Sequence, residues 1–278
     1  MKKKIRIFTV YLILILIAMI MLYPVLWMIS ATFKSNSDIF SDISLIPHKI
    51  TLSGYKAVLR DYGGDINILK AMLNTFRYVV PKVIFTVISS LLTAYGLVRY
   101  NFKGRKIIIA LLLSSLFLPE TVLNIPKFVM FNNFGWVDSP SYLPMVVPSA
   151  FADETCFVFM MMQFMRGVPG ELDEAAQLDG CSPLRILFSI ILPAMKPCVV
   201  TCAVFQFIWS SNDYLSPLLY VNTPSRYPSS VFIKMFQDIE NGFDWNQVMV
   251  ISLVSVLPSI AIYAFTQKYF TDNITVIG

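Results

Sequence analysis

Long apolar runs alternate with polar segments over the whole chain. A helix needs about 20 predominantly apolar residues to cross the hydrocarbon core of a bilayer. Six runs approach or exceed that length, at about residues 7–29, 76–98, 107–125, 143–164, 199–221 and 248–265. We therefore expect an all-α membrane protein with about six transmembrane helices.

The first apolar run follows basic residues and could be confused with a secretory signal peptide. The apolar core of such a signal is usually ~7–15 residues long and ends at a small-residue cleavage site. The run at 7–29 is longer, has no such site at its end, and is followed by further apolar runs. We therefore expect it to be retained as the first helix.

Basic residues near the ends of the runs predict the orientation of the chain. Short loops rich in Lys and Arg stay on the cytoplasmic side of a membrane. The segments at 2–6 and 99–106 contain several basic residues and no acid. We therefore expect both termini in the cytoplasm and the mixed-polarity segment at 30–73 outside.

Composition agrees with this class of protein. Of the 278 residues, 56% are hydrophobic and 14% are charged, with a net charge of +5 at pH 7, whereas an ordinary soluble domain has about 25% charged residues. The mean hydropathy is +0.66. Because the basic residues lie in short clusters at span ends, the positive charge indicates orientation and not binding to nucleic acid.

A polar loop at 168–197 stands between two apolar runs on the expected cytoplasmic side. Pro169 suits the first position of a helix, and acidic residues follow in the first turns, where the helix dipole favours them. Gly180 should end that helix, and the Ser-Pro pair at 182–183 should start a second helix that Pro193 interrupts. Such a rigid polar projection predicts a partner in the cytosol.

This loop resembles a known family in its residues and in their spacing. It reproduces the EAA loop of ABC-importer permeases through Glu174, Ala175, Ala176, Gly180, Ile190, Leu192 and Pro193. A narrower resemblance to the carbohydrate-uptake permeases, the maltose and oligosaccharide type, rests on Asp179, Trp209, Asn212, Asp213, Pro217, Leu218, the basic segment at 99–105 and the tail at 267–270. The family implies a type I ABC importer fold, with residues 1–278 as one permease domain that carries a cytoplasmic coupling helix.

The resemblance also implies a function and a set of partners. The chain is expected to be a permease subunit that moves a sugar or oligosaccharide across the bacterial cytoplasmic membrane. The expected partners are a homologous second permease subunit, two ATPase subunits, an extracytoplasmic solute-binding protein, the sugar and membrane lipid. ATPase docking is expected at Glu174, Ala175, Ala176, Asp179 and Gly180. The sequence has no Gly-rich phosphate loop, so we expect ATP hydrolysis on separate subunits and no enzymatic activity in this chain.

Ionisable and amide side chains inside apolar runs are candidates for a substrate path, because such groups are costly within a membrane. Asp153 and Glu154 stand in the fourth run, and Asn212 and Asp213 interrupt the fifth beside Trp209. Sugars offer hydroxyls to carboxylates and amides, and C–H faces to aromatic rings. The alternative is structural: the same groups would only bridge or bend neighbouring helices.

Two other functions are compatible with parts of the sequence. An ion-coupled secondary carrier could relay protons through Asp153, Glu154 and Asp213, although it would need no docking loop. An importer permease for a non-sugar solute would keep the loop and change the path. A membrane-embedded enzyme would need a nucleophile–base pair or a metal cluster. The four cysteines have no metal spacing and His48 is the only histidine, so we expect no metal and no cofactor.

Overall fold

The computed structural model describes residues 2–41, 43–63, 65–238 and 242–271. The expected all-α class is confirmed: within these ranges the regular structure is helical, apart from the short antiparallel pair β1 (Gln237–Asp238) and β2 (Gly242–Phe243). In the same ranges four segments are long and apolar enough to cross a membrane, or up to five with one bent pair. They are Arg6–Ala31, Ile68–Arg99, Leu143–Arg166, Trp245–Thr266 and the pair Pro183–Ala194 with Lys196–Asn212.

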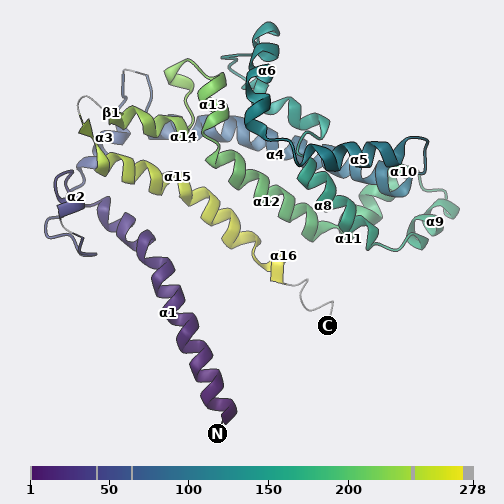
Figure 1. Cartoon of the computed structure of the whole chain (residues 1–278), viewed down its shortest axis with the longest axis horizontal. Coiled ribbons are helices and arrows are strands. Elements are labelled where there is room, and N and C mark those ends of the chain that lie inside the picture. The colour runs from purple at the N-terminus through teal and green to yellow at the C-terminus, as the bar shows by residue number, and fades with distance from the viewer. Residues whose placement is uncertain (1, 42, 64, 239–241, 272–278) are drawn as a thin grey trace.

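The elements follow one another in chain order as a series of long helices joined by short ones (Figure 1). The long ones are α1 (Lys2–Ala31), α4 (Ile68–Arg99), α12 (Lys196–Asn212) and α15 (Trp245–Thr266). Intermediate ones are α5 (Arg105–Ser115), α6 (Glu120–Asn133), α8 (Thr155–Arg166) and α9 (Glu171–Leu178). Short ones are α2 (Asp38–Ser41), α3 (Ser53–Leu59), α7 (Leu143–Val146), η1 (Pro148–Phe151), α10 (Pro183–Ile186), η2 (Leu187–Ile191), α11 (Leu192–Ala194), α13 (Leu215–Tyr220), η3 (Pro224–Arg226), α14 (Ser229–Phe232), η4 (Ile233–Phe236) and α16 (Lys268–Thr271).

The helix α4 is the central element of the fold. The side chain of Asn67 caps its first turn by accepting a hydrogen bond from the backbone N–H of Lys70 at 3.0 Å. With 32 residues, α4 is ~48 Å long, longer than the ~30 Å hydrocarbon core of a bilayer. It contacts α8, α12, α14, α7 and η1, so it supports elements along its whole length.

Three of the expected spans are interrupted in the structure. The span expected at 107–125 is divided into α5 and α6 by a break at 116–119, where Pro119 precedes the first residue of α6. The span expected at 143–164 begins with short turns, and Ala152 has a left-handed backbone (φ 56°) directly before α8. The fifth span bends after Asn212, where Asp213 is extended. These breaks place polar residues in the middle of apolar runs.

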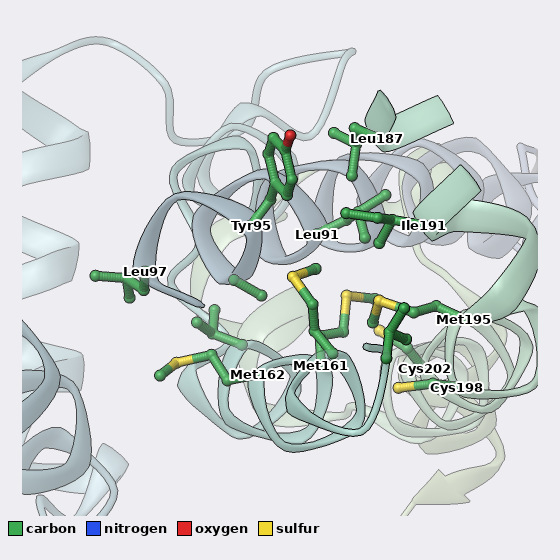
Figure 2. Close-up of a cluster of buried hydrophobic side chains, with 14 of the residues drawn as sticks. Leu91, Tyr95, Leu97, Met161, Met162, Leu187, Ile191, Met195, Cys198 and Cys202 are labelled. Carbon is green, nitrogen blue, oxygen red and sulfur yellow. The ribbon is translucent and has the colours of Figure 1, made fainter. Parts of the chain in front are cut away.

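The largest buried cluster joins α4 to α8, to α12 and to the helices that follow α9. Its members are mainly aliphatic and sulfur-containing side chains, among them Leu91, Met161, Leu187, Ile191, Met195 and Cys202 (Figure 2). Cys198 and Cys202 are buried here as small apolar side chains. The cluster therefore connects the loop at 168–197 to the long helices.

The helix α1 leans away from the other helices (Figure 1). None of the residues in its apolar window is buried within the chain, and Ile20 and Met21 are each 72% exposed. It contacts α15, and Trp27 of α1 lies against Phe40 of α2 with ring centroids 6.4 Å apart, near the end where α1 meets the remaining helices. Most of the apolar surface of α1 is thus not covered by the rest of the described chain.

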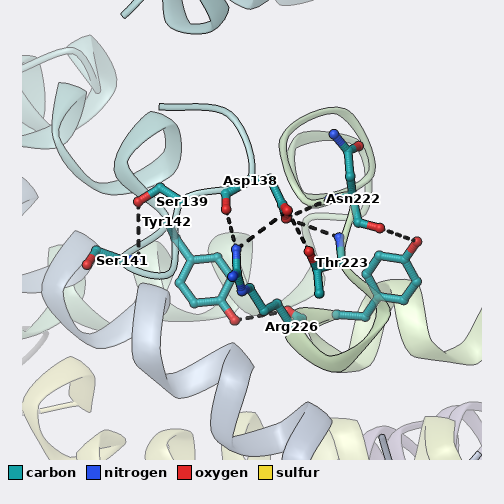
Figure 3. A network of polar contacts seen from close by, with 8 residues as sticks. Asp138, Ser139, Ser141, Tyr142, Asn222, Thr223 and Arg226 are labelled. Carbon is teal, nitrogen blue, oxygen red and sulfur yellow. Dashed lines mark hydrogen bonds and ion pairs between the residues drawn. The ribbon is translucent and has the colours of Figure 1, made fainter. Parts of the chain in front are cut away.

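A group of polar contacts, the loop clamp (Asp138, Asn222, Thr223 and Arg226), ties the segment before α7 to the segment after α13 (Figure 3). The Asp138 carboxylate accepts hydrogen bonds from the Thr223 hydroxyl at 2.5 Å and from the backbone N–H groups of Thr223 and Asn222 at 3.0 and 3.1 Å. The Arg226 guanidinium lies 3.5 Å from the same carboxylate.

Candidate functional site

The loop at 168–197 folds as two successive helical segments, as the sequence predicts. The first, α9, begins at Glu171, two residues later than expected from Pro169. Gly180 ends it with φ +77°, a left-handed conformation that favours glycine. The Gly180 N–H donates to the Gln177 carbonyl at 3.0 Å and the Cys181 N–H donates to the Ala176 carbonyl at 2.9 Å. This pair of bonds is a Schellman motif, which satisfies the last carbonyls of the helix.

The second segment also starts as predicted but bends at a different residue. The Ser182 hydroxyl accepts from the Arg185 N–H and caps α10, which begins at Pro183. The chain continues through the π-helical turn η2 into α11, and Pro193 lies inside α11 without interrupting it. The bend of 81° to α12 lies at Met195 instead. The expected interruption at Pro193 is therefore wrong by two residues.

The C-terminal end of α4 holds this loop in place. Arg99 Nε lies 2.8 Å from the Asp173 carboxylate, and these side chains are only 13% and 11% exposed. A second nitrogen of Arg99 donates to the Val168 carbonyl at 2.9 Å, and the Tyr95 hydroxyl donates to the Pro183 carbonyl at 3.1 Å. The start of α9 and the start of α10 are thus both connected to the last turns of α4.

The outward face of α9 carries most of the predicted docking residues. Glu174, Ala175, Asp179 and Gly180 are exposed, whereas Ala176 is 4% exposed and packs inward. Leu178, which the sequence analysis did not single out, is 90% exposed. The loop therefore presents acidic and apolar side chains together, on a surface that Arg99 and the Schellman turn fix in position.

A cavity of about 590 Å³ opens among α4, the α5–α6 break, the start of α8 and the end of α12; we name it the α4–α8–α12 cavity. It brings together three of the four predicted path residues, Asp153, Glu154 and Asp213. Glu154 pairs with Lys82 of α4 at 3.4 Å. The Asp213 carboxylate accepts from the Ser216 N–H at 3.1 Å, so it also caps α13.

One face of α12 forms a wall of this cavity. Gln206, Trp209, Ser210 and Asp213 line it at spacings of three, four and seven residues, which place side chains on one side of a helix. The polar break in the sequence indicates Asp213 and the resemblance indicates Trp209, whereas Gln206 was not predicted. Gln206 lies two helical turns before Asp213, and this spacing is the signal that could have identified it.

The fourth predicted residue, Asn212, lies elsewhere. Its side-chain amide donates to the Ile208 carbonyl at 2.8 Å, and the residue lines a different cavity of about 420 Å³. This α12–α15 cavity is bordered by α12, α14, η4 and α15. Ser211 lines the same cavity, so the structure places Asn212 and Asp213 in different cavities on two sides of α12.

Among the described residues, no group of three or more His, Cys, Asp or Glu side chains is placed so that it could hold a metal ion. Cys198 and Cys202 are buried, and Cys156 and Cys181 are also free thiols. The groups that line the α4–α8–α12 cavity are carboxylates, the ammonium groups of Lys82 and Lys127, hydroxyls, amides, the Cys156 thiol and an indole ring.

The comparison with protein families decides the class of the protein. The model of the family described as binding-protein-dependent transport system inner membrane component matches residues 86–276. This range includes the loop at 168–197, the α12–α15 cavity and the lining of the α4–α8–α12 cavity apart from Lys82. The chain belongs to this family. The resemblance to ABC-importer permeases is thereby confirmed, and the multi-pass character agrees with a cytoplasmic membrane protein.

Curated relatives of this permease align over nearly its full length. It is 29% identical over 261 residues to the trehalose/maltose transport system permease protein MalG of Thermococcus litoralis, covering 94% of this chain and 92% of that one. It is 27% identical over 266 residues to the arabinooligosaccharides transport system permease protein AraQ of Bacillus subtilis, covering 95% and 92%.

Solved structures share the fold of the permease. A chain from a bacterial ABC transporter involved in the import of the acidic polysaccharide alginate superimposes with a TM-score of 0.81, covering 96% of this chain and 97% of that one at 23% identity. A chain of the MetNI methionine ABC transporter superimposes with a TM-score of 0.58, covering 78% and 96% at 14% identity. The type I importer fold is therefore confirmed.

Proposed function

We propose that this permease subunit moves a saccharide through the α4–α8–α12 cavity, driven by ATP hydrolysis on separate subunits. The observation that carries the proposal is the cavity itself, which Asp153, Glu154 and Asp213 line at the breaks in two apolar segments. Carboxylates in a membrane remain ionised only where water, a partner charge or a ligand reaches them. The names of the curated relatives, which refer to saccharides, support this substrate class.

The loop at 168–197 is the proposed attachment to the ATPase. Its exposed residues Glu174, Ala175, Asp179 and Gly180 would contact the ATPase, and buried Ala176 would support them from beneath. The ion pair between Arg99 and Asp173 would transmit movement of the loop to α4, because it joins the two elements directly.

The remaining partners and the orientation follow from the same proposal. The apolar, unpacked surface of α1 would lie against a homologous second permease subunit and membrane lipid. An extracytoplasmic solute-binding protein would deliver the saccharide to the side opposite the loop at 168–197, with both termini cytoplasmic. Residues 1–278 would form one permease domain.

An ion-coupled carrier remains the competing function, and the loop at 168–197 counts against it. A carrier driven by an ion gradient needs no docking element for an ATPase, whereas this chain presents an ordered, exposed loop that is fixed to α4 by Arg99 and Tyr95. A non-sugar solute is the other alternative, since the fold is shared with a chain of a methionine transporter.

The decisive experiment is uptake by the permease reconstituted in proteoliposomes with its second permease, ATPase and binding protein. We expect uptake of labelled saccharide that requires internal ATP and persists with an uncoupler; uptake that needs an ion gradient and no ATP would overturn the proposal. The variants Asp213→Leu and Asn212→Leu then test the path. A loss of uptake per assembled complex in Asp213→Leu places the path at the α4–α8–α12 cavity, and a loss in Asn212→Leu alone places it at the α12–α15 cavity.

A further inference from the structure

The wall that α12 contributes to the α4–α8–α12 cavity contains a buried carboxamide. Gln206 lines the cavity and is only 1% exposed. Its side-chain Nε2 donates to the Ser210 hydroxyl at 2.9 Å. Its Oε1 is buried and has no hydrogen-bond partner among the described residues. Buried polar atoms are nearly always paired in native proteins, so this half of the amide has a hydrogen-bonding capacity that the described residues leave unused beside the cavity.

The surroundings of Gln206 hold it in place. The carbonyl of Ser210 accepts a hydrogen bond from the Tyr78 hydroxyl at 2.6 Å, which fixes the end of α12 against α4. Reversing the amide would let Oε1 accept from the Ser210 hydroxyl and would leave the NH₂ group unpaired at the same position. Either orientation leaves one half of the carboxamide without a partner, and only the direction of the missing hydrogen bond differs.

Trp209 adds an aromatic surface next to this amide. It lines the same cavity and is 48% exposed. Phe157 and Phe205 hold its ring, with centroid distances of 5.0 and 6.0 Å. A large, partly exposed ring fixed by two other rings offers an apolar face with little conformational freedom to lose on binding.

We propose that Gln206 and Trp209 determine the specificity of the cavity for a polyhydroxylated substrate. One ligand hydroxyl pairs with the free half of the Gln206 amide, and a C–H face of the ligand packs on the Trp209 ring. A hydroxyl both donates and accepts, so it suits either amide orientation. This inference rests on the proposed function, and it names the residues that distinguish one saccharide from another.

Uptake in proteoliposomes by the assembled complex tests the proposal. The probes are labelled maltose, trehalose and arabinotriose, followed by singly deoxygenated analogues of the saccharide that the wild type imports best. A site built to pair with a hydroxyl discriminates strongly against an analogue that lacks it. In Gln206→Met, which keeps the length of the side chain, we expect the preference for the parent over one deoxy analogue to fall by roughly tenfold. The preferences over the other analogues should remain.

The matched control is Ser211→Ala, on the face of α12 that lines the α12–α15 cavity; its preferences should equal those of the wild type. Because the same binding protein delivers every probe, a change in the ratio comes from the permease. Gln206→Asn, which keeps the amide but shortens it, is a second variant and should lower the same ratio. Trp209→Leu should reduce uptake of every saccharide, and Trp209→Phe should restore most of it.

If the ratio of parent uptake to deoxy-analogue uptake, measured per assembled complex, is the same as in the wild type in both Gln206 variants, the inference is overturned and the proposed function stays intact. A proportional loss of uptake of all labelled saccharides, together with a lower yield of assembled complex, would assign Gln206 to helix packing and would also overturn the inference. If the wild type imports none of the saccharides, the proposed function fails first, and the inference fails with it.

Discussion

Asp138 shows how one carboxylate can hold two distant segments together. Burial alone would raise its pKa, but hydrogen bonds from the Thr223 hydroxyl and from the N–H groups of Thr223 and Asn222, together with the charge of Arg226, outweigh burial. The pKa of Asp138 therefore lies below its ordinary value of 3.8. A carboxylate with a depressed pKa in the folded state stabilises the protein only while it is ionised.

The pH dependence of the loop clamp follows from this direction. The contribution of the Asp138 carboxylate to the stability of the folded state should be complete above pH ~4, the pKa of an unfolded Asp. It should be lost as the pH falls through the lower pKa that Asp138 has in the folded state. We expect Asp138→Asn to lower the thermal midpoint in detergent at pH 7, with a difference from the wild type that shrinks below pH ~4. A difference that stays constant from pH 7 to pH 3 would contradict this account of the clamp.

Arg99 is the second residue whose charge has a structural consequence. Removing one partner of a buried ion pair leaves an uncompensated charge and costs about 3–5 kcal/mol. The Arg99–Asp173 pair is largely buried, so Arg99→Gln should lower the free energy of unfolding by ~3 kcal/mol and loosen α9. Thermal unfolding in detergent and limited proteolysis of the loop at 168–197 measure these effects.

The control for Arg99→Gln lies nearby in the chain. Lys103→Gln removes a basic side chain from the segment that follows α4, and we expect little change in stability because that residue is exposed. The double variant Arg99→Leu with Asp173→Leu should recover part of the loss, since no charge is left without a partner. No recovery in the double variant would show that the pair matters for another reason.

At the scale of elements, the ends of helices in the loop at 168–197 were predictable because capping is local chemistry. Gly180 and the Ser182–Pro183 pair act through their own backbone and side chains, and both predictions are confirmed. The bend at Met195 was not predictable from Pro193, because the helical turns that begin at Pro183 continue through Pro193 to Ala194 and the chain bends two residues after the proline.

The docking prediction belongs to the element α9 as a whole. We expect Glu174→Lys to weaken binding of the ATPase through its charge. Gly180→Leu should do so by straining a turn with φ +77°, at a cost of ~1–2 kcal/mol. No heavy atom lies within 4 Å of a Cβ at Gly180, so the effect comes from the backbone and not from a clash. Co-purification of the ATPase and ATP-dependent uptake measure the result.

The membrane part provides the control for these two variants. Both residues lie on the exposed side of the loop, so the strain of Gly180→Leu should stay within the turn after α9, and the yield of the permease should match the wild type. Gly63→Leu, at another left-handed glycine without neighbours within 4 Å, carries a comparable backbone strain far from α9 along the chain. Full binding of the ATPase by Glu174→Lys and Gly180→Leu would remove the docking role from α9.

At the scale of the whole molecule, the apolar pattern predicts the class but not the cavities. Hydropathy locates long runs, whereas the breaks at 116–119 and at Ala152 depend on how the segments pack around α4. The grouping of Asp153 with Asp213 across two spans is a tertiary result that no local pattern contains. Asn212 illustrates the limit: its adjacency to Asp213 in the sequence suggested a shared site, and the packing of α12 against α14 and α15 places it in another cavity.

The orientation of the molecule is the last prediction, and it depends on charge and not on packing. Basic residues without acids at 2–6 and 99–106 predict that both segments are cytoplasmic. We expect a cysteine introduced at Asp61 to react with an impermeant thiol reagent in intact cells, and one at Lys103 to react only after the membrane is opened. Asp61 and Lys103 are both exposed and lie beyond opposite ends of α4, so access to the two sites should differ only by side. Native Cys156 and Cys181 are replaced by serine first, since both are free thiols that are not buried. Labelling at Lys103 but not at Asp61 in intact cells would reverse the orientation and place the loop at 168–197 on the side of the binding protein, where no ATPase could reach it.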